Sequence, residues 1–232
     1  MSWSPPPIDV VSPEQLAFLR EVDSPTIANA VEPFEVRDRT EGFVGGAVRS
    51  LFPELPPTVG YALTVTMSNA PGPVAGREGF WRMWEALERM PAPSVLVVQD
   101  VSGAPTRVAY CGEVMATIAK RLGAVGIVTD GGVRDLAEVR ALGMAYFARY
   151  AVVSHANFWI EEVGAPIELD GQTVRTGDLL HGDGNGIVLV PPQVVADLPA
   201  AVAEVRERER RLMDFVNGPD FTLEGARNPT GY

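Results

Sequence analysis

Short apolar runs alternate with segments of helical hydrophobic spacing through the middle of the chain. Each run has the length and the β-branched content of a strand, and a segment with apolar residues every three or four positions separates most of them. The predicted strands are Val59 to Met67, Ser94 to Asp100, Ala124 to Val128 and Met144 to Ala148, and the predicted helices between them are Arg77 to Met90, residues 113–122 and Leu136 to Leu142. This alternation predicts an α/β fold with a layered sheet. Val59 to Met67 alternates enough to predict a half-exposed strand.

The two ends of the chain show other patterns. Ser12-Pro13-Glu14-Gln15 and Ser24-Pro25 each predict the start of a helix. Gly45 to Leu51 predicts a strand, and Ile167 to Val190 predicts several short strands with turns at Asp170-Gly171 and Gly182 to Gly186. Residues 192–216 predict a long charged helix. Since no linker or repeat divides residues 1–232, we expect one domain, with residues 192–232 packing on a neighbouring subunit.

The segment from Cys111 to Asp135 concentrates the unusual residues of the chain. Val114, Met115, Ile118 and Leu122 share one predicted helix face, which we expect to enter the core. Gly123 ends this helix, a buried strand follows, and Asp130-Gly131-Gly132 then predicts a turn.

Polar residues flank that strand where an α/β sheet binds its ligands. Ligands collect outside the carboxyl ends of parallel strands, because helix N-termini meet there with unpaired N–H groups. Arg134 and Asp135 follow the strand directly, and Glu113 begins the preceding helix. We therefore expect these three residues to form the candidate site.

Composition limits the partners of the chain. A net charge of -11 and a pI of about 4.7 argue against direct binding of nucleic acid, which needs a clustered positive field. One cysteine, Cys111, excludes an intrachain disulfide and is typical of a reducing compartment. No run approaches membrane-spanning length and the first residues lack a signal-peptide pattern, so we expect a cytoplasmic protein with no membrane partner.

The motifs of this segment resemble those of a known family. Gly112-Glu113-Val114-Met115, the run from Gly123 through Asp130-Gly131 to Arg134-Asp135, Thr176 to Leu179 and Asp183 to Pro191 carry the resemblance over about residues 24–210. They resemble the class II pyruvate aldolases that act on 4-hydroxy-4-methyl-2-oxoglutarate. That family also includes the non-catalytic regulator of ribonuclease activity A.

The resemblance implies a layered α/β domain with a swivelling-domain-like β/β/α core, assembled as a homotrimer or homohexamer with the site at a subunit interface. It implies a role for each site residue: Asp135 binds the metal, Arg134 binds the substrate carboxylate and enolate, and Glu113 reaches the metal through water. The Val114 and Met115 amides, after Gly112, hold the carboxylate of pyruvate.

The implied activity is retro-aldol cleavage of a 4-hydroxy-2-keto acid to pyruvate, decarboxylation of oxaloacetate, or both. Oxygen ligands indicate Mg²⁺ or Mn²⁺. An acid on the C-terminal helix of a neighbouring subunit (Glu204, Glu207 or Glu209) completes the proton relay. The alternative is a non-catalytic regulator that binds a ribonuclease.

Each site residue also has a purely structural interpretation. Asp135 with Glu138 is a good capping pair for the next helix, and Arg134 is a surface charge or a partner of Asp130. Glu113 is an acid that the helix dipole favours at an N-terminus.

Two other residue types restrict the chemistry. His155 and His181 are too isolated for an ordinary zinc site. The only lysine, Lys120, lies on a polar helix face beside Arg121, a poor environment for the neutral amine that a Schiff base requires.

Overall fold

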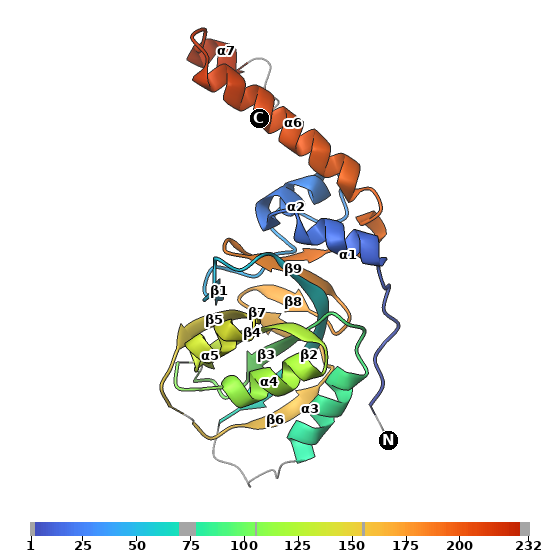
Figure 1. Ribbon diagram of the computed structural model, residues 1–232, viewed down its shortest axis with the longest axis vertical. Coiled ribbons are helices and arrows are strands. Elements are labelled where there is room, and N and C mark those ends of the chain that lie inside the picture. The colour runs from blue at the N-terminus through green and yellow to red at the C-terminus, as the bar shows by residue number, and fades with distance from the viewer. Residues whose placement is uncertain (1–2, 70–77, 105, 155, 228–232) are drawn as a thin grey trace.

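The protein is described by a computed structural model that covers residues 3–69, 78–104, 106–154 and 156–227 (Figure 1). Its helices are α1 Pro13–Arg20, α2 Ser24–Val31, α3 Glu78–Glu88, α4 Glu113–Arg121, α5 Leu136–Ala141, α6 Leu198–Asn217 and α7 Leu223–Arg227, with short 3-10 helices η1 Glu32–Phe34 and η2 Pro192–Val194. Its strands are β1 Arg49–Ser50, β2 Thr58–Ser68, β3 Ser94–Asp100, β4 Ala124–Val133, β5 Ala145–Ala151, β6 Trp159–Val163, β7 Ile167–Leu169, β8 Gln172–Val174, β9 Leu179–Asp183 and β10 Gly186–Val190.

One mixed sheet organises the fold, and it curls almost into a barrel. Its strand order is β1-β5-β4-β3-β2-β9-β10, with β6 also paired to β2. The segment before β1 joins the two edges, because Val44 donates to Ile187 of β10 at 3.0 Å while Arg49 and Ser50 pair with β5. The layered α/β fold that the sequence predicts is confirmed, and its sheet is nearly closed.

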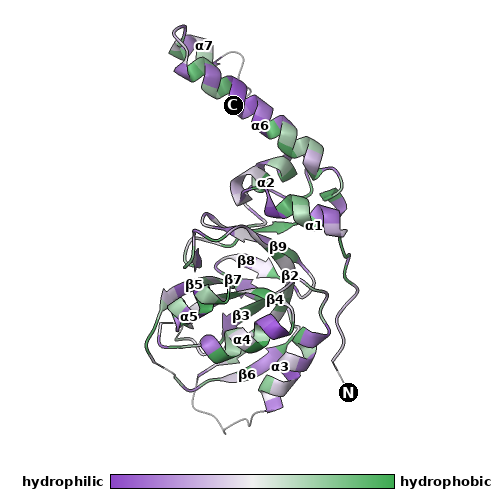
Figure 2. Cartoon of the chain, in the orientation of Figure 1, coloured by the Kyte–Doolittle hydropathy of each residue, from purple (hydrophilic) through white to green (hydrophobic). Residues whose placement is uncertain are grey.

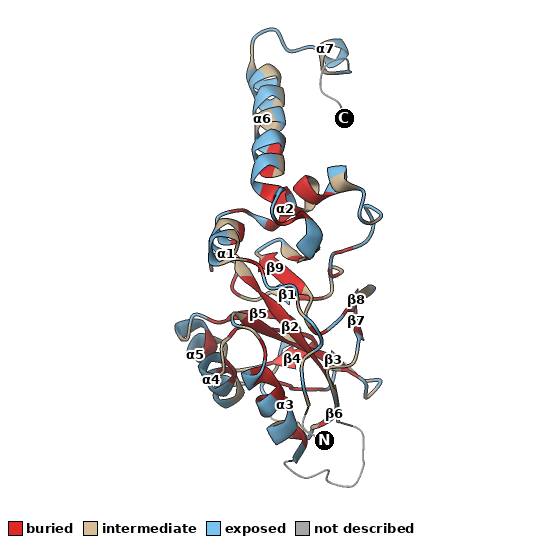
Figure 3. Ribbon diagram, turned by 90° about the vertical axis from the view of Figure 1, so that its right-hand side faces the viewer, coloured by how far each residue is buried: buried red, intermediate tan, exposed pale blue. Residues whose placement is uncertain are grey.

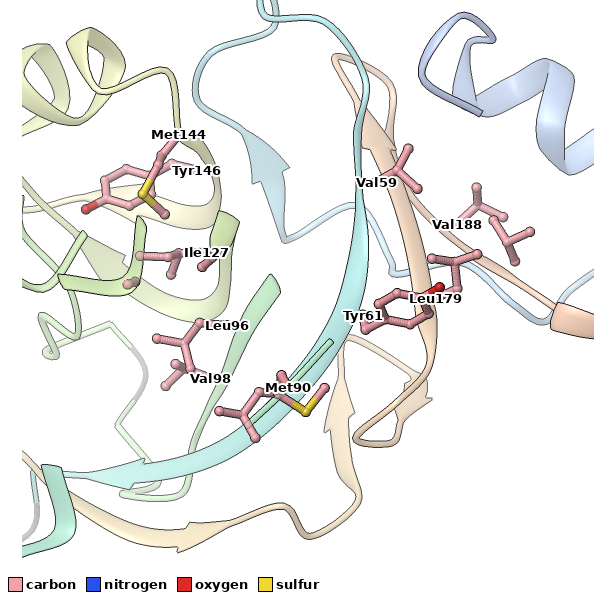
Figure 4. Packing of buried hydrophobic residues seen from close by; sticks show 14 of the residues in the cluster. Val59, Tyr61, Met90, Leu96, Val98, Ile127, Met144, Tyr146, Leu179 and Val188 are labelled. Atoms are coloured by element: carbon pink, nitrogen blue, oxygen red, sulfur yellow. The ribbon is translucent and has the colours of Figure 1, made fainter. Parts of the chain in front are cut away.

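Two apolar cores lie on the two sides of this curved sheet. The inner core fills the barrel with small and β-branched residues such as Val95, Val97 and Val128, and the β7–β8 hairpin covers it with Ile167 and Leu169. The outer core lies between the sheet and the helices. Its residues include Leu96, Val98, Ile127, Met144 and Tyr146, which Figure 4 shows together.

The strands β2 to β5 are parallel neighbours connected through α3, α4 and α5. These helices lie together on the outer side of the sheet (Figure 1). In such a layer the carboxyl ends of strands meet the N-termini of the helices that follow, which positions the candidate site. The strand β2 is buried along nearly its whole length, so the prediction that it is half exposed is wrong. Both of its faces are covered, one by helices and one by the barrel interior.

The amino-terminal helices form a corner against β9. Ser12 and Gln15 make the capping box of α1, and Asp23 caps α2 through the Thr26 amide at 2.9 Å. His181 of β9 is fully buried beneath this corner, where its Nε2 lies 2.8 Å from the Leu19 carbonyl and its Nδ1 2.9 Å from the Ser24 hydroxyl. His181 is therefore a structural residue that joins the corner to the sheet.

The C-terminal helix α6 extends away from the body of the molecule (Figure 1). Leu198, Val202 and Val205 in its first half are buried, whereas its second half is largely exposed (Figure 3) and carries charged residues among apolar ones (Figure 2). Met213 is 55% exposed. Within the described residues, no helix is long and apolar enough to cross a membrane.

Several predicted elements have other bounds in the structure, and two are shorter near their amino ends. The strand predicted from Gly45 to Leu51 shortens to Arg49–Ser50, because residues 46–47 form a turn. The helix predicted from Arg77 to Met90 is observed as Glu78–Glu88, and Arg77 lies outside the described residues.

Candidate functional site

Two segments that are 22 residues apart meet at the end of β4. Tyr110 and Cys111 run beside the last residues of this strand: the Tyr110 amide donates to the Gly132 carbonyl and the Arg134 amide to the Cys111 carbonyl, both at 2.9 Å. This short parallel pairing places the start of α4 against the start of α5. As the sequence predicts, Glu113 and the pair Arg134-Asp135 are thereby brought together.

The expected turn at Asp130-Gly131-Gly132 does not exist, because β4 continues to Val133. The glycines serve close packing instead. A Cβ on Gly131 would lie 2.7 Å from side-chain atoms of Val108 and Tyr110, and one on Gly132 would lie 2.6 Å from the Val108 carbonyl oxygen. The pairing of β4 with β5 shifts register at a bulge between Thr129 and Gly132, next to these glycines.

Asp135 contacts the first turn of α4. Its Oδ2 accepts a hydrogen bond from the Glu113 amide at 2.8 Å. Asp135 also precedes α5, but its side chain makes no capping bond there, so pairing with Glu138 as a capping box is not observed. Its backbone lies in the left-handed region with φ 59° and ψ 47°. Such a conformation is costly for a residue other than glycine and is a common feature of functional sites.

Gly112 allows this contact. It is the N-cap of α4, and having no side chain it leaves the cap to another residue. A Cβ at this position would lie 2.4 Å from Oδ2 of Asp135 and 2.9 Å from Nε of Arg134. Any side chain here would displace both groups, which explains why the helix begins with glycine.

The Arg134 guanidinium lies beside the Asp135 carboxylate, with Nε 3.5 Å from Oδ2. Both side chains are about one third exposed, 34% and 33% respectively. Asp130, the other partner considered for Arg134, instead accepts the Asp100 amide at 2.7 Å. Arg134 is thus a partly solvated cation at a helix N-terminus, where it can meet an anionic ligand.

The first turn of α4 presents unpaired amides beside these side chains. The Glu113 amide binds Asp135, and the Ala116 amide binds the Gly112 carbonyl at 3.0 Å. Within the described part of the chain, the Val114 and Met115 amides have no acceptor. Two free N–H groups at a helix N-terminus favour an anion such as a carboxylate.

The face of α4 that enters the core is only partly the predicted one. Met115 and Leu122 pack against the core as predicted, whereas Val114 is 72% and Ile118 is 37% exposed. The small Ala116 and Ala119 are buried in their place and let α4 approach the sheet closely. Val114 and Ile118 are one helical turn apart and form an exposed apolar patch beside the site.

Lys120 and Glu113 lie on the exposed part of the same helix. The Lys120 ammonium donates to the Leu142 carbonyl just after α5, so it is occupied at a helix C-terminus, away from the first turn of α4. The Glu113 side chain is exposed at that first turn. An exposed carboxylate there can order water next to Asp135.

The donor set at this site fits a hard cation with few protein ligands. Among the described residues, no group of three or more His, Cys, Asp or Glu side chains could hold a metal. His181 is committed to backbone carbonyls, and His155 lies outside the described residues. Mg²⁺ commonly keeps several waters and uses one or two carboxylates plus substrate oxygens. Asp135, with Glu113 nearby, suits such an ion and does not suit structural zinc.

A second acidic pair lies deeper at the same sheet edge, where the position of Asp100 at the end of its predicted strand places it. Asp100 and Asp130, at the carboxyl ends of β3 and β4, are each 9% exposed. Burial, and after it the nearby Asp100 carboxylate, raise the pKa of Asp130 to about 6, against the opposing hydrogen bond from the Asp100 amide. The Tyr110 hydroxyl donates to Asp100. These bonds hold the Tyr110 segment that leads into α4.

An open cleft of about 450 Å³ lies elsewhere, between the α1–α2 corner and the β9–β10 turn. Asp23 and Asp183 line it, but their carboxylates already accept backbone amides of Thr26, Ser24 and Asn185. The cleft is located at the amino end of β2, where Thr58 pairs with Gly182, and not at the carboxyl ends that carry Arg134 and Asp135. We therefore place the candidate site at α4 and not in this cleft.

Fold and site together define an α/β protein in which a helix N-terminus with free amides lies beside a paired arginine and aspartate. Comparisons with known proteins show its family. The family model described as RraA-like, aldolase/RraA, matches residues 24–189, and the chain belongs to this family.

Among curated relatives, a protein of Halalkalibacterium halodurans named as a candidate 4-hydroxy-4-methyl-2-oxoglutarate aldolase is 31% identical over 144 residues, which is 60% of this chain and 68% of that protein. One of the same name from Azotobacter vinelandii is 32% identical over 42% of this chain and 59% of its own length.

Solved structures show the same fold over most of the chain. An uncharacterized protein from Pseudomonas syringae pv. tomato aligns with a TM-score of 0.72 and 26% identity, covering 97% of this chain and 99% of that one. Streptomyces coelicolor RraAS2, described as an unusual member of the RNase ES inhibitor RraA family, aligns with a TM-score of 0.68 and 25% identity, covering 88% of this chain and 99% of that one. The family therefore holds proteins with names from both an enzyme and an inhibitor branch.

Proposed function

We propose that this protein is a divalent-metal-dependent lyase that forms pyruvate from a 2-keto acid. The substrate is a 4-hydroxy-2-keto acid of the 4-hydroxy-4-methyl-2-oxoglutarate type, cleaved in a retro-aldol reaction, or oxaloacetate, which is decarboxylated. The observation that carries the proposal is the meeting of Arg134, Asp135 and the free amides of α4 at one helix N-terminus. The names of the aldolase relatives support the same activity.

Asp135, aided through water by Glu113, would hold Mg²⁺ or Mn²⁺. When bound, this ion supplies Lewis-acid polarisation of the 2-keto carbonyl and stabilises negative charge on its oxygen. Oδ2 of Asp135 already accepts the Glu113 amide, so Oδ1 is the oxygen available to the metal. The bond from Glu113 fixes the carboxylate at the helix N-terminus before any ligand arrives.

The other residues of the site bind the organic anion. The Val114 and Met115 amides after Gly112 hold the carboxylate of the keto acid, and Arg134 neutralises both this carboxylate and the enolate oxygen. In the retro-aldol direction the C4 hydroxyl loses its proton, the C3–C4 bond breaks, and its electron pair forms the enolate of pyruvate. In the decarboxylation the same enolate forms as carbon dioxide leaves. Protonation at C3 then yields pyruvate, by way of water ordered by Glu113.

A neighbouring subunit supplies a further acid in this proposal. In its own chain α6 packs on α2, at the far end of the molecule from α4 (Figure 1), so a glutamate of α6 must come from a second copy. Hydrogen bonds from Arg210 and Arg211 lower the pKa of Glu207 to about 2, which makes Glu207 a poor proton carrier. Glu209 lies 3.4 Å from the Asn29 side chain. Glu204 is therefore our choice, in a homotrimer or homohexamer whose interface also covers Val114 and Ile118.

The alternative is a non-catalytic protein that regulates a ribonuclease, which the assignment of RraAS2 to an RNase ES inhibitor family supports. The paired Arg134-Asp135 and the acid Glu113 favour the enzyme, because a surface inhibitor needs neither a metal ligand nor an enolate-binding cation.

Pyruvate release from oxaloacetate and from 4-hydroxy-4-methyl-2-oxoglutarate tests the proposal. We expect release to stop in excess chelator and to resume with Mg²⁺ or Mn²⁺. We expect Arg134→Lys to lose nearly as much turnover as Arg134→Ala, about 100-fold, because a point charge cannot reproduce the planar bidentate contact. Full activity in chelator would refute the metal. Absence of activity on both acids, together with inhibition of a ribonuclease, would establish the regulator.

A further inference from the structure

The Tyr110 side chain joins the segment before α4 to the carboxyl ends of three strands. Its ring packs on the bare backbone of Gly131 in β4, so closely that an added Cβ would lie 2.7 Å from Cδ2 of the tyrosine. Its hydroxyl donates to the Asp100 carboxylate at the end of β3 and lies 3.2 Å from the Met67 carbonyl oxygen of β2. Met67 and Asp100 are paired neighbours in these two strands. One side chain therefore spans β4, β3 and β2.

The Asp100 carboxylate is held in place to receive this hydroxyl. The Ser102 hydroxyl donates to its Oδ1 at 2.7 Å, and the Asp100 amide donates to Oδ1 of Asp130 at 2.7 Å. Both Asp100 and Tyr110 are buried. Burial, and after it the bond to Asp100, raise the pKa of Tyr110, so the hydroxyl keeps its proton and remains a donor. A hydrogen bond to a carboxylate is strong where water is excluded, so this bond is a firm anchor.

The segment is anchored on its other side as well. The Tyr150 hydroxyl of β5 binds the backbone of Val108, at 3.2 Å from its amide nitrogen and 3.0 Å from its carbonyl oxygen. Main-chain hydrogen bonds of 2.9 Å hold Tyr110 and Cys111 to the end of β4. Of the two side-chain anchors, Tyr110 is the one nearer to α4.

The position of Tyr110 determines how the helix begins. Only Cys111 and the N-cap Gly112 separate it from α4, and Gly112 has no side chain that could fix the first turn. The direction of the free Val114 and Met115 amides therefore depends on how firmly the residues before Gly112 are held.

We infer that Tyr110 is a positioning residue whose hydroxyl bond to Asp100 aligns the carboxylate-binding amides of α4. This inference rests on the proposed function and names a further residue that serves the same site. The carboxylate next to the keto group is unchanged by the reaction, so the amides bind it equally in the ground state and in the transition state. Loss of their alignment should weaken substrate binding and spare turnover at saturating substrate. Asp135 follows β4 and not this segment, so Mn²⁺ binding should change little.

The test compares Tyr110→Phe with Tyr61→Phe in the full-length chain. Both substitutions remove a bonded hydroxyl from a fully buried tyrosine, but the Tyr61 hydroxyl binds the Val11 amide at 2.8 Å. Tyr61 pairs with Ser94 at the amino end of β3, whereas the site is at the carboxyl ends of the strands. We expect both variants to fold with melting temperatures lowered by about 2–6 °C, so a general loss of stability is matched between them.

Substrate affinity should separate the two variants. With saturating Mn²⁺, Tyr110→Phe should raise the KM for the keto acid that the wild type cleaves, and the inhibition constant of pyruvate, each about 10-fold. In Tyr61→Phe both constants should stay within about twofold of the wild type. Turnover and Mn²⁺ affinity should stay within about threefold in both variants. Asp100→Ala should raise the KM similarly, and the double variant with Tyr110→Phe should show no further rise, because the hydroxyl acts through this carboxylate.

A KM of Tyr110→Phe within twofold of the wild type would overturn the positioning role. An equal rise in Tyr61→Phe, or additive effects in the double variant, would overturn it as well. Failure of the proposed function is distinguishable, because the wild-type protein itself would then release no pyruvate from either acid, and both inferences would fall.

Discussion

Asp135 combines two roles that a single substitution can separate. It caps α4 through the Glu113 amide, and it is the proposed metal ligand. Asparagine keeps an oxygen acceptor for that amide and, among residues other than glycine, tolerates the left-handed backbone well. Asp135→Asn should therefore change the free energy of unfolding by less than about 1 kcal/mol, since Asn and Asp are similar helix caps. It should nevertheless abolish metal binding, because the neutral amide is a poor ligand for a hard cation.

Asp135→Ala removes both features. Loss of the cap costs about 1 kcal/mol, and an alanine at φ 59° and ψ 47° costs a further 1–2 kcal/mol or so. The sum, about 2–3 kcal/mol, corresponds to a melting temperature lowered by about 4–12 °C for a chain of this length. Asp135→Gly should lie between the other two variants, because glycine loses the cap but relieves the backbone.

Thermal unfolding in chelator and Mn²⁺ calorimetry measure the two roles separately. Mn²⁺ binding by Asp135→Asn at wild-type affinity would refute the ligand assignment. Equal melting temperatures for Asp135→Asn and Asp135→Ala would show that neither the cap nor the left-handed backbone contributes to stability.

Three further substitutions test other parts of the account. Gly112→Ala should lower Mn²⁺ affinity and turnover at least 10-fold and destabilise the fold by about 1–3 kcal/mol, because the alanine methyl group would collide with the Asp135 carboxylate. A Gly112→Ala variant that binds Mn²⁺ as tightly as the wild type would contradict this. Lys120→Ala should retain most of the activity, and borohydride with pyruvate should trap no adduct on the wild-type protein, as mass spectrometry can verify. Asp130→Asn should stabilise the protein by about 2 kcal/mol at pH 8 and leave it unchanged near pH 4, in denaturant titrations at both pH values.

The sign for Asp130 follows from its raised pKa. Burial lifts the pKa of Asp130 to about 6, so the folded protein holds this proton more tightly than the unfolded chain does. Ionisation of Asp130 therefore destabilises the fold as the pH rises through 6, and this penalty disappears as the pH falls from 6 towards 4. Asparagine is neutral at every pH and still accepts the Asp100 amide. A variant that is less stable than the wild type at pH 8 would show that the charge of Asp130 is favourable.

The sequence predicts the elements of this fold well where local signals decide them. Ser12 and Gln15 specify the start of α1, and the apolar run of β3 has the observed bounds Ser94–Asp100. Prediction from the sequence fails where packing between segments far apart in the chain determines the structure. Gly131 and Gly132 have the composition of a turn, yet they lie in a strand because Val108 and Tyr110 pack against them. No periodicity within one segment carries this information.

The candidate site shows the same division. The positions of Glu113 and Arg134 beside sheet and helix ends follow from the order of elements, and the structure brings them together. The hydrogen-bond partner of Asp135 cannot be predicted from the order of elements. The local pattern with Glu138 predicts a cap on α5, whereas the carboxylate accepts the first amide of α4.

Competition between oxalate and pyruvate tests the central claim, that the site stabilises a pyruvate enolate, most directly. Oxalate is planar and dianionic like the enolate, so a site complementary to the high-energy species should bind it more tightly than pyruvate. We predict this preference for the wild-type protein with Mn²⁺ and its loss in Asp135→Asn, which keeps the helix cap. Equal inhibition constants for oxalate and pyruvate in the wild type, or an unchanged preference in Asp135→Asn, would contradict enolate stabilisation at this site.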